Sequence, residues 1–213
     1  CQNYKNFELI FIIQDFSKKQ KELLKRKIDE KKSNNIKKVR IFEGSKIPSL
    51  GEKLNYAISS ANGEYIAKMD DDDLYFKNYL SDMALPFKYG NFGLVGKQEV
   101  FAFFEGDRKF IRRYPKKSHM ETDLVFGATF VFPKNVALEI PFEARSTGED
   151  SSFIKNIQNA GYKIYATDPF NFVWWRSSNN DFHSWKNFDS GHILNSNLTK
   201  IVSNSIDENI VDI

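Results

Sequence analysis

The chain has almost no cysteine, no long apolar run and no signal-peptide pattern, and each absence narrows its possible class. Its single cysteine, Cys1, excludes internal disulfides and any cysteine-based zinc site, which is consistent with a reducing compartment. No run reaches the roughly 18 apolar residues that would span a bilayer. The N-terminus lacks the regions of a signal peptide and an initiator methionine, so we expect a cytoplasmic chain that begins inside a longer protein.

Several common catalytic motifs are also missing. The sequence contains no P-loop, no G-x-S-x-G, no H-E-x-x-H, and no Gly-x-Gly-x-x-Gly after its first predicted strand. These absences reduce the number of enzyme classes that remain open, and they do not by themselves favour one of those classes.

Positive charge is concentrated in one segment. Residues 17–40 hold eleven Lys and Arg against three Asp and Glu, whereas the whole chain has a net charge of +3. Such a segment can contact anionic lipid headgroups, nucleic acid or an acidic polymer, or it can be a solvated Lys-rich helix face. No nucleic-acid motif or interleaved aromatic residue accompanies it, so we expect no nucleic-acid partner. Peripheral contact with the inner face of the membrane and a solvated helix face both stay open.

The first half of the chain alternates between strand and helix patterns. The continuous apolar run at 7–13 is typical of a strand buried on both faces. The sequence predicts strands at 7–13, 37–42 and 64–69 and helices at 17–32, 48–61 and 74–87. This order predicts an α/β fold with a mostly parallel sheet and helices on both faces. Ligands of such sheets bind beyond the carboxyl ends of the strands, where Asp15 and Asp70–Asp73 fall.

The second half predicts shorter elements. Residues 92–115 read as short strands joined by a turn at "EGD", residues 123–133 as an apolar strand with an embedded glycine, and residues 170–176 as a further strand. A helix in 148–166 is expected to end at Gly161, with a strand after it. We expect one domain over 1–185, followed by a polar tail over 186–213 that packs loosely or leads into another domain.

Four consecutive aspartates follow the third predicted strand, in "GEYIAKMDDDDLYF". Carboxylates two residues apart at a strand end can supply oxygen ligands to Mg²⁺ or Mn²⁺, with Asp70 and Asp72 as the pair. The alternative is that Asp73 caps a helix starting at Leu74 and its neighbours favour the first turn. Capping explains one or two acids better than four, so the sequence favours a metal pair with Asp73 as the cap.

This segment resembles the DXD region of family 2 glycosyltransferases, which have the GT-A fold. The resemblance implies that Asp70 and Asp72 bind the metal on the donor's diphosphate, and Asp71 then faces the ribose or only fills the loop. "QNYKNFELIFIIQD" is similar to the family's second-strand segment, which implies that Asp15 contacts the nucleotide base. "LGEKLNYAISSANGEYI" resembles the preceding helix, with Asn55 in the place of its asparagine. An arginine is common just before that asparagine, but this chain has Leu54, with Lys53 one position earlier.

A second acidic pair lies in "STGEDSSF". Thr147 and Asp150 fit the [ST]-x-x-[DE] capping pattern, which is one explanation of the pair. The family resemblance implies another, in which Asp150 is the general base that deprotonates the acceptor hydroxyl and Glu149 orients groups around it. Upstream, "FGATFVF" resembles the family's strand in which a small residue, here Gly127 or Ala128, leaves room for the acceptor sugar.

The last predicted strand and its loop, "WWRSSNNDFHSW", complete the set of candidates. His183, followed by Trp185, resembles a His-x-Trp that completes the metal shell in some of these enzymes, although a lone histidine can also be structural. Arg176 can neutralise phosphate oxygens, since a planar guanidinium suits bidentate contact. Adjacent strand residues point to opposite faces, so at most one of Trp174 and Trp175 can stack on a sugar.

The ordered set of motifs predicts an inverting, metal-dependent transfer of sugar from a nucleotide-sugar, with a UDP-sugar favoured, to a hydroxyl on a bacterial surface glycan of the capsular type. Members of the family normally begin with one more strand and helix, so we expect the first unit to be missing here. A non-catalytic scaffold domain with this fold and a metal-dependent phosphohydrolase remain as alternatives.

Overall fold

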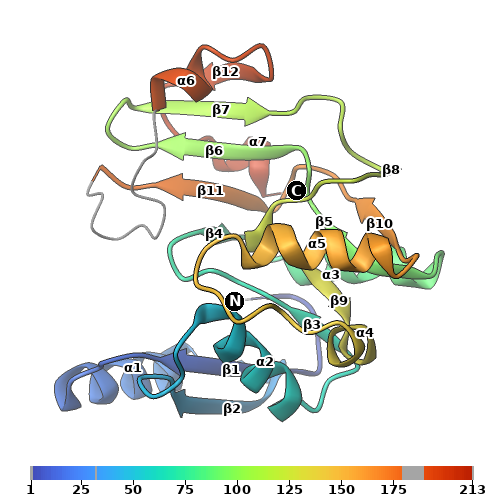
Figure 1. The fold of residues 1–213 in the computed structure, drawn as a ribbon. Helices are drawn as coiled ribbons and strands as arrows, with labels where there is room; N and C mark the ends of the chain where they lie inside the picture. Colours follow the sequence, from blue (N-terminus) through green and yellow to red (C-terminus); the bar gives the residue numbers. More distant parts are fainter. Residues whose placement is uncertain (1, 32, 179–189, 213) are drawn as a thin grey trace.

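The computed structural model describes residues 2–31, 33–178 and 190–212 of the chain, and its sheets and helices form an α/β fold (Figure 1). Among the described residues there are three sheets, with strand orders β1-β2, β3-β9-β5-β10-β8 and β12-β7-β6-β11-β4. No described helix combines the length and the apolar composition that a bilayer crossing needs.

The N-terminal elements match the predicted ones closely. They are β1 (Phe7–Ile13), α1 (Lys18–Lys31), β2 (Ile36–Glu43) and α2 (Leu50–Ser60), and β1 pairs with β2 in parallel. The prediction that β1 is buried on both faces is wrong, because only Ile13 of its residues is buried. β1 and β2 form a two-stranded sheet of their own in the described chain, so much of each strand stays accessible.

Helix α1 carries the basic segment and packs loosely. None of its residues is buried, and Lys21 forms an ion pair with Glu43 at 2.5 Å. These features fit a solvated basic helix. Membrane contact by this segment stays a prediction, which flotation with vesicles containing anionic lipid would check.

The two five-stranded sheets hold the rest of the strands. The first contains β3 (Tyr65–Ala67), β5 (Phe92–Gly96), β8 (Met120–Glu121), β9 (Val131–Pro133) and β10 (Lys163–Ala166). The second contains β4 (Leu74–Tyr75), β6 (Val100–Phe104), β7 (Lys109–Arg113), β11 (Phe172–Arg176) and β12 (Thr199–Ser203).

Strand direction differs from the expectation of a mostly parallel sheet. Only β1–β2, β5–β10 and β6–β11 are parallel among the nine described pairings. The predicted turn at "EGD" explains part of this difference, because it joins β6 to β7 as a hairpin and short hairpin connections give antiparallel pairs.

The remaining helices are α3 (Tyr79–Ala84), α4 (Lys134–Glu139), α5 (Glu149–Asn159), α6 (Ser190–Leu194) and α7 (Glu208–Val211), with 3₁₀ turns η1 (Leu85–Lys88) and η2 (Gly127–Thr129). The helix predicted from residue 74 begins only at Tyr79, because Leu74 and Tyr75 pair with β11 instead. The strand predicted at 123–133 is reduced to β9, with η2 around its embedded glycine.

Helix α5 is held against the first large sheet by aromatic packing. Its residues Phe153, Ile154 and Ile157 are buried, and Phe153 stacks on Phe142 with ring centroids 4.1 Å apart. Burying a side chain of this size contributes about 1.5–3 kcal/mol. The helix ends as predicted near Gly161, whose N–H donates to the Gln158 carbonyl at 2.9 Å. This packing fixes the N-terminus of α5, which carries Glu149 and Asp150. That end of the helix lies beside Asp70–Asp73, the aspartate loop between β3 and β4.

The C-terminal segment adds to the second large sheet. Strand β12 pairs antiparallel with β7, and Val211 in α7 is fully buried in a cluster with Phe101, Phe110 and Val173. The described part of the tail therefore has more regular structure than its polar composition predicts.

Candidate active site

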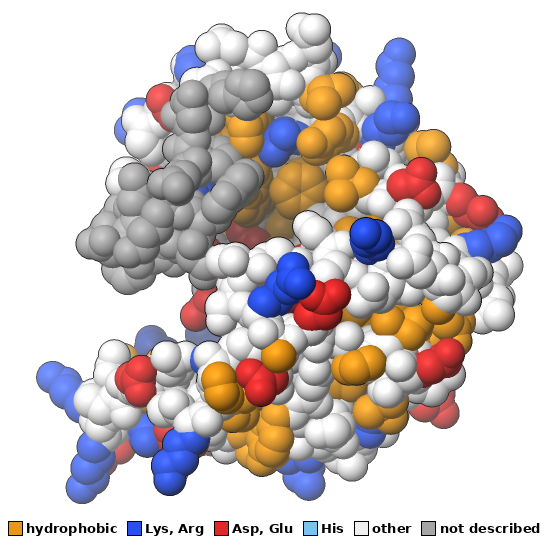
Figure 2. All heavy atoms as spheres, viewed as in Figure 1, with side chains coloured by type: hydrophobic (Ala, Val, Ile, Leu, Met, Phe, Trp, Pro, Cys, Tyr) orange, Lys and Arg blue, Asp and Glu red, His pale blue; other side chains and the backbone are white. Residues whose placement is uncertain are grey.

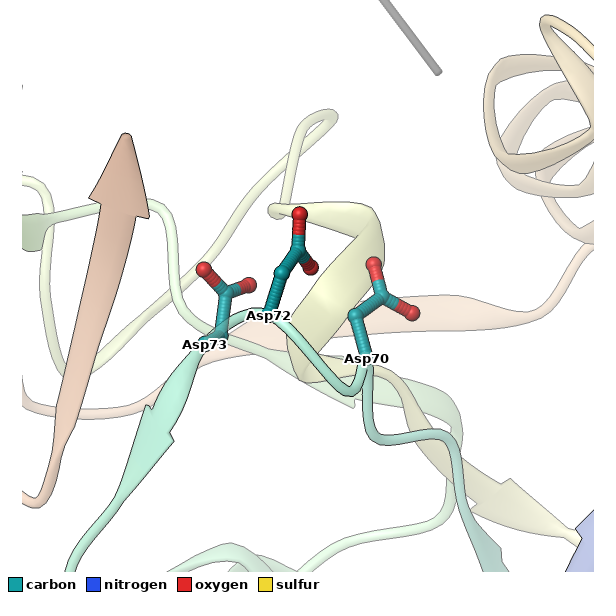
Figure 3. A group of neighbouring side chains, drawn as sticks. All are labelled: Asp70, Asp72 and Asp73. Carbon is teal, nitrogen blue, oxygen red and sulfur yellow. The ribbon is translucent and has the colours of Figure 1, made fainter. Parts of the chain in front are cut away.

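The aspartate loop joins the two large sheets, because it follows β3 of one and precedes β4 of the other (Figure 3). The carboxylates of Asp70, Asp72 and Asp73 point to the same side of this loop, and each offers an oxygen within 4.8 Å of the others. Asp71 is exposed and is not part of this group. Three carboxylate oxygens at this spacing suit a hard divalent cation such as Mg²⁺ or Mn²⁺.

The role predicted for Asp73 as a helix cap is wrong. Its carboxylate accepts a hydrogen bond at 2.9 Å from the backbone N–H of Trp175 in β11, and no helix starts at Leu74. Burial raises the pKa of Asp73 to about 8, and the neighbouring Asp72 and Asp70 add to this shift. A cation at this position would supply the positive charge that keeps such a group ionised, so the residues present fit a metal ion.

Lys68 also belongs to the site, although no sequence motif pointed to it. Its buried ammonium donates to Asp70 Oδ1 at 2.8 Å and lies 3.5 Å from Asp150 Oδ2. Burial alone would lower its pKa, but the carboxylates of Asp70 and Asp150 raise it above the ordinary value. A signal was available, because residues two apart on an extended segment face the same side and Lys68 precedes Asp70 by two. The lysine thus joins the two acidic motifs into one site.

Asp150 lies in the first turn of α5, and its side chain is partly buried, with 28% of its surface exposed. The capping explanation is wrong, because the N-cap is Gly148, at φ +76°, and no side chain caps the helix. Burial raises the pKa of Asp150 to about 6; Lys68 opposes the shift, whereas Glu149 and Asp70 add to it. Its Oδ1 is buried and accepts no hydrogen bond in the described structure. Because Oδ1 has almost no accessible surface whereas 28% of the side chain is exposed, a bound hydroxyl would approach the exposed part of the side chain rather than Oδ1.

Gly127 leaves room for the carboxylate of Asp150. A Cβ on Gly127 would lie 1.8 Å from Asp150 Oδ2, which no side chain tolerates. The family resemblance implies that a small residue here leaves room for an acceptor sugar, whereas the observed neighbour of Gly127 is the candidate base Asp150. Tyr75 also ties the two parts together, since its hydroxyl accepts from the Asp70 N–H at 2.8 Å and donates to the Ala128 carbonyl at 2.7 Å.

Arg176 and Glu149 both lie at this site. Arg176 ends β11 and is buried, and burial lowers the pKa of its guanidinium while Asp72 and Asp73 partly offset that effect. Glu149 is buried beside Asp150 and contributes to the field that raises the pKa of Lys68. The structure thus brings together Asp70, Asp72, Asp150, Glu149 and Arg176 from the predicted set.

The three predicted nucleotide contacts near β1 lie on a different part of the chain from the aspartate loop. Asp15 is exposed at the end of β1 with φ +55°, and Lys53 donates to the side chain of Gln14 beside it. Asn55 instead uses both ends of its amide on the backbone of Phe142, at 2.8 and 2.9 Å, which anchors α2 to the segment before α5. Leu54, where an arginine is common, packs against the core around α5.

His183 and Trp185 lie outside the described residues, so the structure gives no position for the third predicted metal ligand.

The fold and the site define an α/β domain with a candidate cation centre next to a partly buried carboxylate, that of Asp150. The model of the family "Glycosyl transferase family 2" matches residues 1–141, which is more than half of the chain. The chain therefore belongs to glycosyl transferase family 2, and the family expected from its motifs is confirmed. The search of curated proteins found no match.

Two solved structures of TarS from S. aureus, both of residues 1–349, are similar to this chain. The complex with UDP gives a TM-score of 0.59 at 18% identity, covering 85% of this chain and 55% of that one. The other structure of TarS gives 0.56 at 16% identity, covering 98% and 60%. At these identities the likeness shows the fold, which confirms the expected GT-A-like α/β class. The chain spans less than two thirds of the TarS chain that it matches.

Proposed function

We propose that this domain transfers a sugar from a nucleotide-sugar donor to a hydroxyl of a bacterial glycan, with metal dependence and inversion at the anomeric carbon. The observation that carries the proposal is that one ammonium, that of Lys68, links two acidic parts of the site. It lies 3.5 Å from Oδ2 of the partly exposed Asp150, and it donates to Asp70 of the aspartate group (Asp70, Asp72 and Asp73). Family membership supports the reaction class. A UDP-sugar is the favoured donor, because the similar TarS was solved in complex with UDP.

On the donor side, Asp70, Asp72 and Asp73 would hold Mg²⁺ or Mn²⁺, which neutralises charge on the diphosphate leaving group. Arg176 lies close enough to Asp72 and Asp73 for its charge to act on theirs, so it is well placed for the same phosphate oxygens. We assign Asp15, Lys53 and Asp71 to the nucleotide. Asn55 contributes indirectly by fixing α2, and His183 remains a candidate ligand from the sequence alone.

On the acceptor side, the Asp150 carboxylate accepts the hydroxyl proton as the hydroxyl oxygen attacks the anomeric carbon. The bond from that carbon to the diphosphate oxygen breaks in the same displacement, so the configuration inverts. The negative charge of Glu149 helps to raise the pKa of the base Asp150. Lys68 holds the carboxylates of Asp70 and Asp150 in place.

The test is a thermal-shift panel of UDP-, GDP- and CDP-sugars, with and without Mn²⁺, on the full-length protein. A ligand at 100 times its Kd stabilises the folded state by about 2.7 kcal/mol, enough for a clear shift. We expect one nucleotide to stabilise the protein, and only with the metal. No shift with any donor would contradict the proposal. Release of phosphate or nucleotide without any acceptor would instead favour the phosphohydrolase alternative.

Replacement of Lys68 tests the link between the two acidic groups. In Lys68→Met the positive charge that lowers the pKa of Asp150 is lost, so that pKa is expected to rise above about 6. The midpoint of the pH–rate profile should shift upward, with transfer at pH 7 reduced and recovered at higher pH. Lys68→Arg keeps the charge and is the control. A profile that does not move in Lys68→Met would show that Lys68 has only a structural role.

A further inference from the structure

The end of β7 holds two neighbouring arginines in different electrostatic settings. Arg112 donates to the buried carboxylate of Glu99. Arg113 points to the other face of the strand, as alternation requires, and no acidic side chain in the described chain pairs with it. Its Nε is buried and lacks a hydrogen-bond partner, and burial lowers the pKa of its guanidinium. A half-buried cation without a carboxylate is costly, and a bound anion would offset that cost.

Arg113 is surrounded by aromatic rings. Its Cζ lies 4.9 Å from the ring centroid of Tyr114 and 5.9 Å from those of Phe126 and Trp174. Phe126 and Trp174 contact each other with centroids 5.5 Å apart, and all three rings are only partly buried. Together the four side chains offer apolar faces beside one positive charge, which is a combination suited to a sugar ring that carries an anionic group.

This cluster borders the candidate active site on the acceptor side. Phe126 is followed by Gly127, against which Asp150 packs, and the opposite edge of the cluster meets Arg176, whose Cζ is 5.5 Å from the Trp174 ring. Figure 2 shows a hollow between α5 and β7 in which hydrophobic and basic side chains lie together. A group bound at Arg113 would therefore be near the hydroxyl that Asp150 activates.

We propose that Arg113, with Tyr114, Phe126 and Trp174, binds a negatively charged group of the acceptor, so that the acceptor is an anionic glycan. This inference rests on the proposed function and specifies its acceptor. A phosphate and a carboxylate share the chemistry that a guanidinium recognises, and both can be carried by a glycan.

The experiment measures saturable binding of small anions to the full-length protein in metal-free buffer with a chelator, where the aspartate group repels anions. The probes are methyl phosphate and the methyl glycoside of glucuronic acid, with neutral methyl glucoside as the control, and the readout is tryptophan fluorescence together with NMR of the probe. We expect one anionic probe to bind and the neutral probe to show no binding. The probe that binds identifies the group as a phosphate or a carboxylate.

Variants assign that binding to the cluster. Arg113→Gln is expected to weaken it at least tenfold, and Arg113→Lys less strongly, because lysine keeps the charge but not the planar fork. Arg108→Gln removes the same charge from an exposed turn and should leave binding unchanged. Equal binding in wild type and Arg113→Gln, or no saturable binding of either anion, overturns the inference. Donor binding with Mn²⁺ is measured in parallel on the wild type. If the donor binds but no anionic probe does, only the inference about the acceptor fails. If the wild type does not bind the donor either, the proposed function itself is contradicted.

Discussion

Asp150→Asn is expected to reduce sugar transfer by orders of magnitude while leaving metal-dependent donor binding nearly unchanged. The substitution keeps the shape of the side chain but removes the oxygen that takes the proton, and general-base catalysis typically contributes 10²–10⁴-fold, so we expect a loss of roughly that size. Turnover assays measure the first effect and calorimetry with donor and Mn²⁺ measures the second. Turnover of Asp150→Asn at the wild-type rate, or loss of its metal-dependent donor binding, would contradict our assignment of roles.

The pH dependence of sugar transfer by the wild type is a second test of Asp150 as the general base. Because burial raises the pKa of Asp150 to about 6, transfer should rise as the pH passes through about 6 and level off above it. Residual transfer in Asp150→Asn should not show this rise.

Stability provides the control for misfolding. A carboxyl group whose pKa is raised from 3.8 to about 6 on folding stabilises the native state below about pH 4, and this contribution is lost as the pH rises through about 6. At pH 8 the ionised Asp150 no longer has this stabilising contribution, so its loss in Asp150→Asn should not lower the free energy of unfolding. The loss of the ion pair with Lys68 acts in the opposite direction, and calorimetric melting at pH 8 shows whether the variant is folded.

Gly127→Ala tests whether transfer depends on the position of the Asp150 carboxylate, which packs against Gly127. The added methyl group would collide with the Asp150 carboxylate, so the base must move although no charge is lost. We expect transfer to fall sharply with donor binding retained, as in Asp150→Asn. Normal transfer in Gly127→Ala would show that the position of Asp150 is not critical.

Asp72→Ala is expected to abolish metal-dependent donor binding, and transfer with it. The variant removes one of the three carboxylates that converge on the candidate cation centre. Calorimetry with Mn²⁺, and with UDP in the presence of Mn²⁺, should show no saturable binding at concentrations that saturate the wild type.

The matched control for this loss of charge is Asp107→Ala, which removes a carboxylate from the exposed turn between β6 and β7. It should bind metal and donor as the wild type does. If Asp72→Ala also binds both normally, the aspartate group does not hold the metal.

Much of the local structure was predictable because it depends on short-range pattern. The apolar run of β1, the helix of α2 and the strand of β11 were placed within one or two residues of their observed bounds, and side-chain periodicity and propensity are local properties. The start of α3 was misplaced because Leu74 and Tyr75 look helical in isolation but pair with a strand about 100 residues later. Long-range pairing overrides local preference in such cases.

The sequence by itself determined the order of the motifs, the family and the presence of two acidic groups at the ends of elements. Only the tertiary structure decided what each carboxylate meets. Asp73 joins the candidate cation centre because Trp175, 102 residues away, holds it there. Lys68 meets Asp150, and Arg113 meets Phe126 and Trp174, only after three sheets and a helix have packed. Contacts between residues far apart in the sequence leave no periodic pattern, and the ionisation of a buried group depends on those contacts.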